Sequence, residues 1–517
     1  MDKLKLIKNK RGSVAGLCFA TSLIFTSPAY SSDWICTSPD DWGNGTCWFT
    51  GSVPAAGDSA NFFADSANDV VINYSGAVNS ADILSEIFMN NSGTGSMVLN
   101  LNSGLDLNAN LGVIGTDGNA EINHSAGNAN YTYFLMSDQT GSSSVYNISG
   151  TASLNSNVGI WIGGTGSGVL NQTGGSIMSD EFTLGSATGG YGEYNFSSGT
   201  LTANNEYVGF FGDAYLHQTG GIHNVVNLHI GRKTGTGVYV FDAGTISVAN
   251  QLEVGTIPAE PGSTTQNAIF EQNGGTLTAS GHVRVSASGM ANSYYDLNGG
   301  TLTAPTVINN NNFEYSGGSI NGDLENHDTL VINGGGERVL NGNLTNVGET
   351  YFAHTFNVGT PEEYSINRTA NGDILFEDGT RMTVTGNVVL EDLGTVRFDL
   401  DSGYLDITDS SWVTSLMDIT IGGDLDLDQL SFSTLDALSS DYYSWTIFEG
   451  ASLTGTFDQI LLPDYPAWML ELVYTGTTVE LQATHQLASV PLPPSMWMLL
   501  SGLLGFMSIS RREKRKV

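Results

Sequence analysis

The sequence predicts an all-β protein whose body is a parallel β-helix (β-solenoid), with a strand-rich C-terminal cap and a terminal hydrophobic helix. Three observations lead to this expectation. A unit of about 23 residues returns along the chain, each unit holds short stretches of alternating apolar residues, and glycines separate these stretches. Apolar residues form 40% of the 517 residues, which argues against disorder because there is enough apolar surface to bury.

Each repeat is an apolar or aromatic stretch, a glycine-containing turn, and then Thr or Ser followed by Leu or Ile. Copies occur at Val169–Ile177, Tyr194–Leu201, Tyr215–Ile222, Val240–Ile246, Phe270–Leu277 and Tyr295–Leu302. The second glycines fall at 175, 199, 221, 244, 275, 300 and 318, with spacings of 24, 22, 23, 31, 25 and 18 residues. A β-propeller is the alternative, but its blades need about 40 to 50 residues.

One unit cannot bury its inner face alone, whereas stacked units can, each coil adding about 4.8 Å. Coils from about residue 60 to 400 would number around 15 and form a rod of roughly 70 Å. Glycine provides the positive φ that each corner needs. Asparagines stacked at equivalent turns are expected to form side-chain ladders: Asn171, Asn195, Asn273 and Asn298.

We expect five parts along the chain. They are a signal peptide (1–31), an N-terminal cap segment with a disulfide (32–60), β-solenoid repeats (61–395), a C-terminal β cap region (396–487) and a sorting tail (488–517). The cap region alternates apolar and acidic residues, as in Val396–Asp401 and Gly423–Asp428. Such a cap protects the last open edge of a solenoid.

The N-terminus has the layout of a secretory signal. Met1–Arg11 holds five bases, Val14–Phe25 is apolar, and Ala29-Tyr30-Ser31 offers small residues at the spacing that a signal peptidase needs. A short anchor helix is the alternative, although about a dozen apolar residues are too few to span a bilayer comfortably.

The C-terminus carries a proline motif, an apolar run and a basic end. The motif is Val490-Pro491-Leu492-Pro493-Pro494, and Ser495–Ser510 and Arg511–Val517 follow. The prolines exclude a helix before the apolar run, whose length of about 16 to 19 residues barely spans a bilayer. The bases stay cytoplasmic by the positive-inside rule, so the body is expected outside the inner membrane.

This tail resembles the PEP-CTERM class of sorting signals, in its Val-Pro-Leu-Pro variant, over about the last 28 residues. The resemblance implies recognition by an exosortase while the protein is held transiently in the inner membrane. It also implies cleavage near the prolines and release to the cell surface or extracellular matrix of a Gram-negative bacterium. Pro494 stands where the variant usually has Ala, so the cleavage point stays open. A plain tail anchor is the alternative.

The body also resembles a known group. Its Gly-Gly-Thr-Leu units look like the repeats of autotransporter passenger domains and of many exosortase-sorted proteins, and Trp34–Phe63 looks like their first segment. Unlike an autotransporter, this chain ends in a short sorting tail.

The charge balance excludes one class of partner. The formal net charge is −35, and each end contributes five bases and one acid, so the mature body is near −43. Such a body repels phosphate backbones and is not expected to bind nucleic acid. High acidity favours solubility and contacts with divalent cations. No cofactor is predicted, with calcium as the one open possibility.

Two cysteines remain outside the signal. In an oxidising compartment, Cys36 and Cys47 are expected to form one local disulfide. Its loop of about 12 residues would add about 2 to 3 kcal/mol. A metal site is the alternative, but it lacks a nearby second pair of Cys or His.

No nucleophile elbow or phosphate loop occurs in the sequence, so no enzyme is predicted. Acidic pairs at Asp399 and Asp401, and at Asp424, Asp426 and Asp428, could act as acid and base or hold calcium. Alternation alone predicts the simpler interpretation, a solvated outer face.

Two other patterns were weighed as metal sites. His217, His223 and His229 recur every six residues, but a repeat near 23 places them on different sides of one coil. Gly189–Asn195 resembles one calcium nonapeptide, with Glu193 in place of Asp. A single copy indicates a turn.

Three functions remain in order of preference. The first is a non-enzymatic exported surface or matrix protein, a scaffold or adhesin-like rod. Its expected partners are signal peptidase and exosortase during export, and extracellular polysaccharide. The second is a secreted polysaccharide lyase or hydrolase, which requires acids and a base to converge on one face of adjacent coils. The third is a calcium-dependent carbohydrate-binding module.

Overall fold

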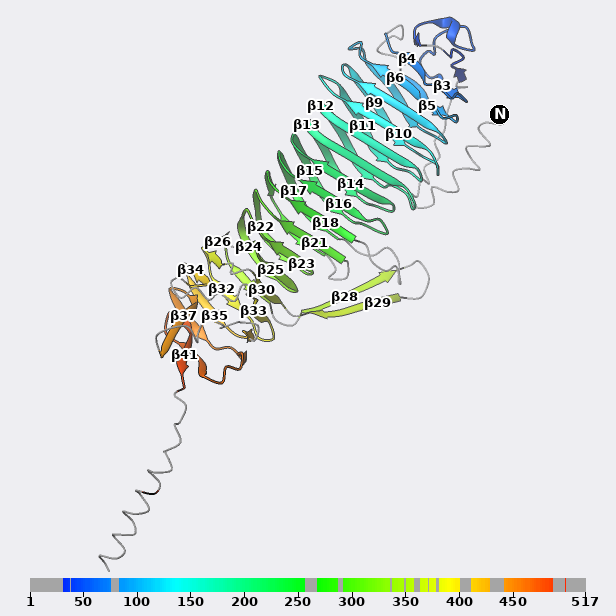
Figure 1. Ribbon diagram of the computed structural model, residues 1–517. Helices are drawn as coiled ribbons and strands as arrows, with labels where there is room; N and C mark the ends of the chain where they lie inside the picture. The colour runs from blue at the N-terminus through cyan, green and yellow to red at the C-terminus, as the bar shows by residue number, and fades with distance from the viewer. Residues whose placement is uncertain are drawn as a thin grey trace, which may run out of the picture.

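The computed structural model describes residues 31–37, 39–75, 83–255, 267–286, 292–334, 337–347, 350–357, 363–370, 372–377, 381–399, 411–427, 441–486 and 498. Its elements are strands with one short 3-10 helix, η2 (Gly45–Cys47), so the predicted all-β class is confirmed. The strands stack along an elongated body that begins near β3 and ends at β41 (Figure 1).

The first strands are β1 Ser31–Asp33, β2 Asp40–Asp41, β3 Ser59–Ala64, β4 Val70–Asn73, β5 Ile83–Asn91, β6 Met97–Leu101, β7 Leu107–Ile114, β8 Asn119–His124, β9 Asn128–Met136, β10 Ser143–Ile148, β11 Ser153–Ile162, β12 Ser167–Leu184 and β13 Tyr191–Val208. The middle strands are β14 Asp213–Gln218, β15 Ile222–Ile230, β16 Gly237–Phe241, β17 Thr245–Val254, β18 Asn267–Gln272, β19 Thr276–Ala279, β20 His282–Val285, β21 Asn292–Leu297, β22 Thr301–Asn309, β23 Asn312–Tyr315, β24 Ser319–Asn326, β25 Thr329–Ile332, β26 Glu337–Asn341 and β27 Leu344–Asn346.

The last strands are β28 Thr350–Asn357, β29 Glu363–Ala370, β30 Asp373–Glu377, β31 Arg381–Val384, β32 Val388–Leu390, β33 Thr395–Asp399, β34 Val413–Ser415, β35 Asp418–Ile421, β36 Asp424–Asp426, β37 Tyr442–Glu449, β38 Ser452–Gly455, β39 Gln459–Leu461, β40 Trp468–Tyr474 and β41 Thr478–His485.

Strand pairing in the body is parallel and joins residues one sequence repeat apart. Tyr146 lies beside Leu170, which lies beside Tyr194, and Tyr194 lies beside Leu216. β12 and β13 pair over almost their whole length, with register shifts near their middle. Repeated units therefore lie directly over one another, at the strand spacing of about 4.8 Å.

Two parts depart from this pattern. β28 and β29 form an antiparallel hairpin that stands out from the stack (Figure 1). At the C-terminal end, β41 pairs antiparallel with both β37 and β40. Antiparallel strands there cover the end of the stack, as a cap would.

Alternation of side chains fills the interior of the stack. In β14, the burial pattern alternates along the strand, with Ala214, Leu216 and Gln218 buried. Interior aromatic rings of paired strands pack in tilted contacts, with centroids 5.0 Å apart for Tyr239 and Phe270 and 4.9 Å for Phe270 and Tyr295. Such contacts add to the free energy of burial.

The predicted glycine corners and asparagine ladders are present, but Asn171 and Asn195 lie within β12 and β13 and not at turns. All seven second glycines of the repeat have positive φ, from 67° at Gly175 to 102° at Gly199. Asn195 donates to Asn171 at 3.0 Å, and Asn298 donates to Asn273 at 3.1 Å. The first ladder begins further toward the N-terminus, through Asn73, Asn100, Asn123 and Asn147.

Among the described residues, no helix is both long enough and apolar enough to cross a membrane. The predicted terminal helix and the signal peptide fall outside the described residues, apart from Met498 in the tail and Ser31 at the end of the signal.

Candidate functional site

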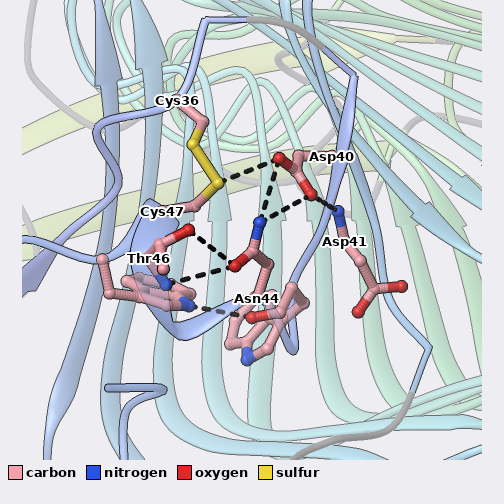
Figure 2. Close-up of a disulfide and its surroundings, with 8 residues drawn as sticks. Cys36, Asp40, Asp41, Asn44, Thr46 and Cys47 are labelled. Atoms are coloured by element: carbon pink, nitrogen blue, oxygen red, sulfur yellow. Dashed lines mark hydrogen bonds between the residues drawn. A yellow bond between two sulfur atoms is a disulfide. The ribbon is translucent and has the colours of Figure 1, made fainter. Parts of the chain in front are cut away.

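The N-terminal segment is closed by a disulfide and an aromatic cluster. Cys36 and Cys47 are bonded, with their Cα atoms 5.0 Å apart, so the predicted disulfide is confirmed (Figure 2). Trp42, Trp48 and Phe62 are buried, with ring centroids 4.9 to 5.3 Å apart. The cluster covers the first end of the core.

Asp40 lies beside the disulfide, and its Oδ2 is 3.1 Å from Cys47 Sγ (Figure 2). A disulfide sulfur has no proton, so this is a close contact and not a hydrogen bond. Cys36, Asp40 and Cys47 are the one group of metal-binding residue types that converges within the described residues. Because thiolates are the metal ligands, the bonded sulfurs do not support the metal alternative.

The three histidines lie in different surroundings, as their spacing predicted. His217 Nε2 is 2.7 Å from Asp242 Oδ2 on the outer surface. His223 points into the core, where it is fully buried. His229 faces outward from β15 and stacks on Tyr207 with centroids 5.4 Å apart. They do not form a metal site.

His229 belongs instead to an outward row that sequence reasoning missed. His229, Glu253 and Arg284 occupy paired positions on β15, β17 and β20. Glu253 lies between its neighbours, with Oε2 3.1 Å from His229 Nδ1 and Oε1 3.9 Å from Arg284 Nη1. The second function hypothesis requires acids and a base on one face of adjacent coils, whereas this row holds one acid between two bases.

Electrostatics favour the ionised carboxylate in this row. Burial raises the pKa of Glu253, but hydrogen bonding and charge from His229, with the charge of Arg284, hold that pKa below its usual range. Burial and the charge of Arg284 lower the pKa of nearby His282. The pair is shielded, since the His229 side chain is 8% exposed and that of Glu253 is 13% exposed. The ion pairs hold the Glu253 carboxylate in place as a hydrogen-bond acceptor, but its low exposure gives a substrate little access to it.

The C-terminal carboxylates are only partly described. Asp426 accepts a bond from Arg397 Nε at 2.8 Å and is 6% exposed. Its ion pair opposes the expectation of a solvated face at this position, because the arginine covers it. Asp401 and Asp428 lie outside the described residues, as does the side chain of Asp399.

A second row that the sequence analysis missed is acidic. Glu271, Asp296 and Glu314 occupy paired positions on β18, β21 and β23. Burial and the charges of Glu314 and Glu271 raise the pKa of Asp296 to about 6. Aligning the repeats by their glycines would have revealed the row, because each of these acids stands three residues before the first glycine of its pair.

A buried polar chain was also missed. Glu206 and His223 are both 0% exposed, and Glu206 Oε2 lies 2.5 Å from His223 Nε2. His223 Nδ1 is 2.9 Å from the hydroxyl of Tyr239, which donates to Gln218. These residues replace aliphatic or aromatic ones, since the neighbours of Glu206 in the register are Phe182 and Leu228.

Two remaining predictions concern turns and sorting. Gly189 has a φ of 80° in the turn before β13, whereas Tyr191–Asn195 already belong to that strand, so only the start of Gly189–Asn195 is a turn. The sorting motif Val490–Pro494 lies outside the described residues.

No family model matches the chain, and no curated protein matches it.

Proposed function

We propose that this chain is a non-enzymatic exported surface or extracellular-matrix protein, a parallel β-helix that acts as a scaffold or adhesin-like rod. The observation that carries this proposal is the series of parallel pairings, one repeat apart, from β3 to β39. A stack of this kind makes a stiff spacer, because each coil is hydrogen-bonded to both neighbours.

Both covered ends support a free-standing rod. Rings of Trp34, Trp42 and Trp48 lie over the first coils, and antiparallel β40 and β41 lie at the other end. Covered ends prevent edge-to-edge association of strands. Small-angle X-ray scattering on the secreted protein tests the β-helix: a rod-like profile is expected, and a compact one would contradict it.

Export and sorting rest on the two ends of the sequence. We infer removal of residues 1–31 by signal peptidase, a transient stay in the inner membrane and cleavage by an exosortase near Val490–Pro494. Pro491→Ala/Pro493→Ala is expected to keep the tail on the protein and hold it in the inner membrane, whereas the control Ser495→Ala is released. Normal release of the proline variant would contradict recognition of the motif.

A second candidate, a polysaccharide lyase or hydrolase, is favoured only by the row of His229, Glu253 and Arg284. Size-exclusion chromatography of acidic and neutral polysaccharides after incubation with the protein tests it. Shortened chains that disappear with Glu253→Gln would support catalysis. Unchanged chains would leave the row with a structural role and favour the scaffold.

A further inference from the structure

An uncharged groove lies on the stack over neighbouring residues of β13, β15, β17 and β19. Its volume is about 400 Å³. Carbon atoms make up most of its exposed surface, with hydroxyl and amide groups between them, and none of its lining residues is charged. The polar lining residues are Thr202, Asn204, Asn224, Ser247, Thr278 and Ser280.

Four of these side chains form one straight row. Thr202 pairs with Asn224, Asn224 with Ser247, and Ser247 with Thr278. Neighbours are therefore separated by the strand spacing of about 4.8 Å, and the row extends over about 14 Å. Within the part of the chain that the structure describes, none of the four side chains has a hydrogen-bond partner. The row offers donors and acceptors at a regular interval.

Aliphatic surface lies beside the row. Val226 is 36% exposed in the groove. Outside its lining, Ile222 on β15 is 49% exposed, and Met178, which pairs with Thr202 from β12, is 55% exposed. Alternating hydroxyl, amide and aliphatic groups suit a ligand that carries both hydroxyl groups and C–H faces. Because strands and not loops carry these groups, the groove is held in one shape.

The surroundings discriminate between polymers. A body of this negative charge repels polyanions, and the groove holds no cation to bind a carboxylate or phosphate. β13, β15 and β17 are each paired on both sides, so a peptide cannot add a strand here. A neutral sugar polymer carries no charge and needs no strand edge to bind. Its sugar units repeat along the chain and present uncharged hydroxyl groups.

We propose that this groove binds a neutral polysaccharide chain that lies along the stack, with its hydroxyls on Thr202, Asn224, Ser247 and Thr278. This inference rests on the proposed function, because a surface or matrix location is what would bring the protein to such a polymer.

Calorimetric titration of the full secreted protein tests it with neutral hexasaccharides of glucose, galactose and mannose, and with an alginate hexamer. At least one neutral chain is expected to bind, and the acidic one is not. Thr202→Val/Ser247→Ala/Thr278→Val should weaken binding at least tenfold, because three side chains lose their hydrogen bonds to the ligand. The matched control Ser143→Ala/Ser167→Ala, on the outer face of β10 and β12, should bind like the wild type.

Failure of the neutral panel, preference for alginate, or unchanged binding by the triple variant would overturn the inference. Far-ultraviolet circular dichroism of each variant verifies that the fold is kept. If the protein is exported and processed but binds no neutral chain, only the binding proposal for the groove is wrong. If it binds a neutral chain but is never exported, only the proposed function is wrong.

Discussion

The buried pair of Glu206 and His223 gives the sharpest test of the packing. Each occupies an interior position that an apolar residue fills in the adjacent coils: Glu206 stands between Phe182 and Leu228, and His223 between Leu201 and Ile246. Leucine therefore fits both sites. Glu206→Leu alone leaves His223 Nε2 without an acceptor in the core, and breaking such a buried pair costs about 3 to 5 kcal/mol.

The double variant Glu206→Leu/His223→Leu removes the whole pair. Its expected stability is equal to the wild type or higher by about 1 to 4 kcal/mol, because two desolvated polar groups become apolar. Tyr239 keeps its bond to Gln218 in this variant. The two substitutions should therefore be strongly non-additive.

Native-state hydrogen exchange is the appropriate assay, because repeat proteins open locally and need not unfold in two states. Amides of β13 and β15 should exchange faster in each single variant and recover in the double variant. Double-variant exchange that equals the summed effects of the single variants would refute the reasoning.

Three further predictions concern other parts of the stack. Burial and neighbouring acids raise the pKa of Asp296 to about 6, so its negative charge destabilises the fold increasingly as pH rises from about 4 to 6. After allowance for solvent screening, Asp296→Asn should raise the free energy of unfolding by about 1 to 2 kcal/mol at pH 7 and leave it unchanged at pH 4. Thermal melts measure this difference, and an equal gain at both pH values would exclude the charge of Asp296 as its cause. Cys36→Ser/Cys47→Ser should cost about 2 to 3 kcal/mol and raise protease cleavage in the N-terminal cap, with a wild-type digestion pattern as the contrary result. Asn171→Leu breaks the ladder on both sides, so exchange at β12 and β13 should quicken, whereas no change would mean that the side-chain bonds add nothing to the backbone ladder.

The sequence predicted what depends on local chemistry. Glycines at the corners, alternating apolar residues and the Cys36–Cys47 spacing are each visible in a short window, and each appears in the structure. The asparagine ladders followed from repeat spacing alone.

Features that depend on register were harder to predict. His229, Glu253 and Arg284 are separated by 24 and 31 residues, and the longer interval hides their alignment. Glu206 could not be recognised as an interior residue, because Glu on a strand normally faces water and only its pairing with His223 makes burial tolerable.

We propose that the chain is exported and sorted to the surface or matrix. Intact mass spectrometry of the protein from each fraction of an exosortase-bearing host tests this proposal. We expect an extracellular species that lacks residues 1–31 and the segment after the proline motif, and its loss when the exosortase is deleted. A full-length tail retained in the inner membrane of the exosortase-bearing host would contradict it.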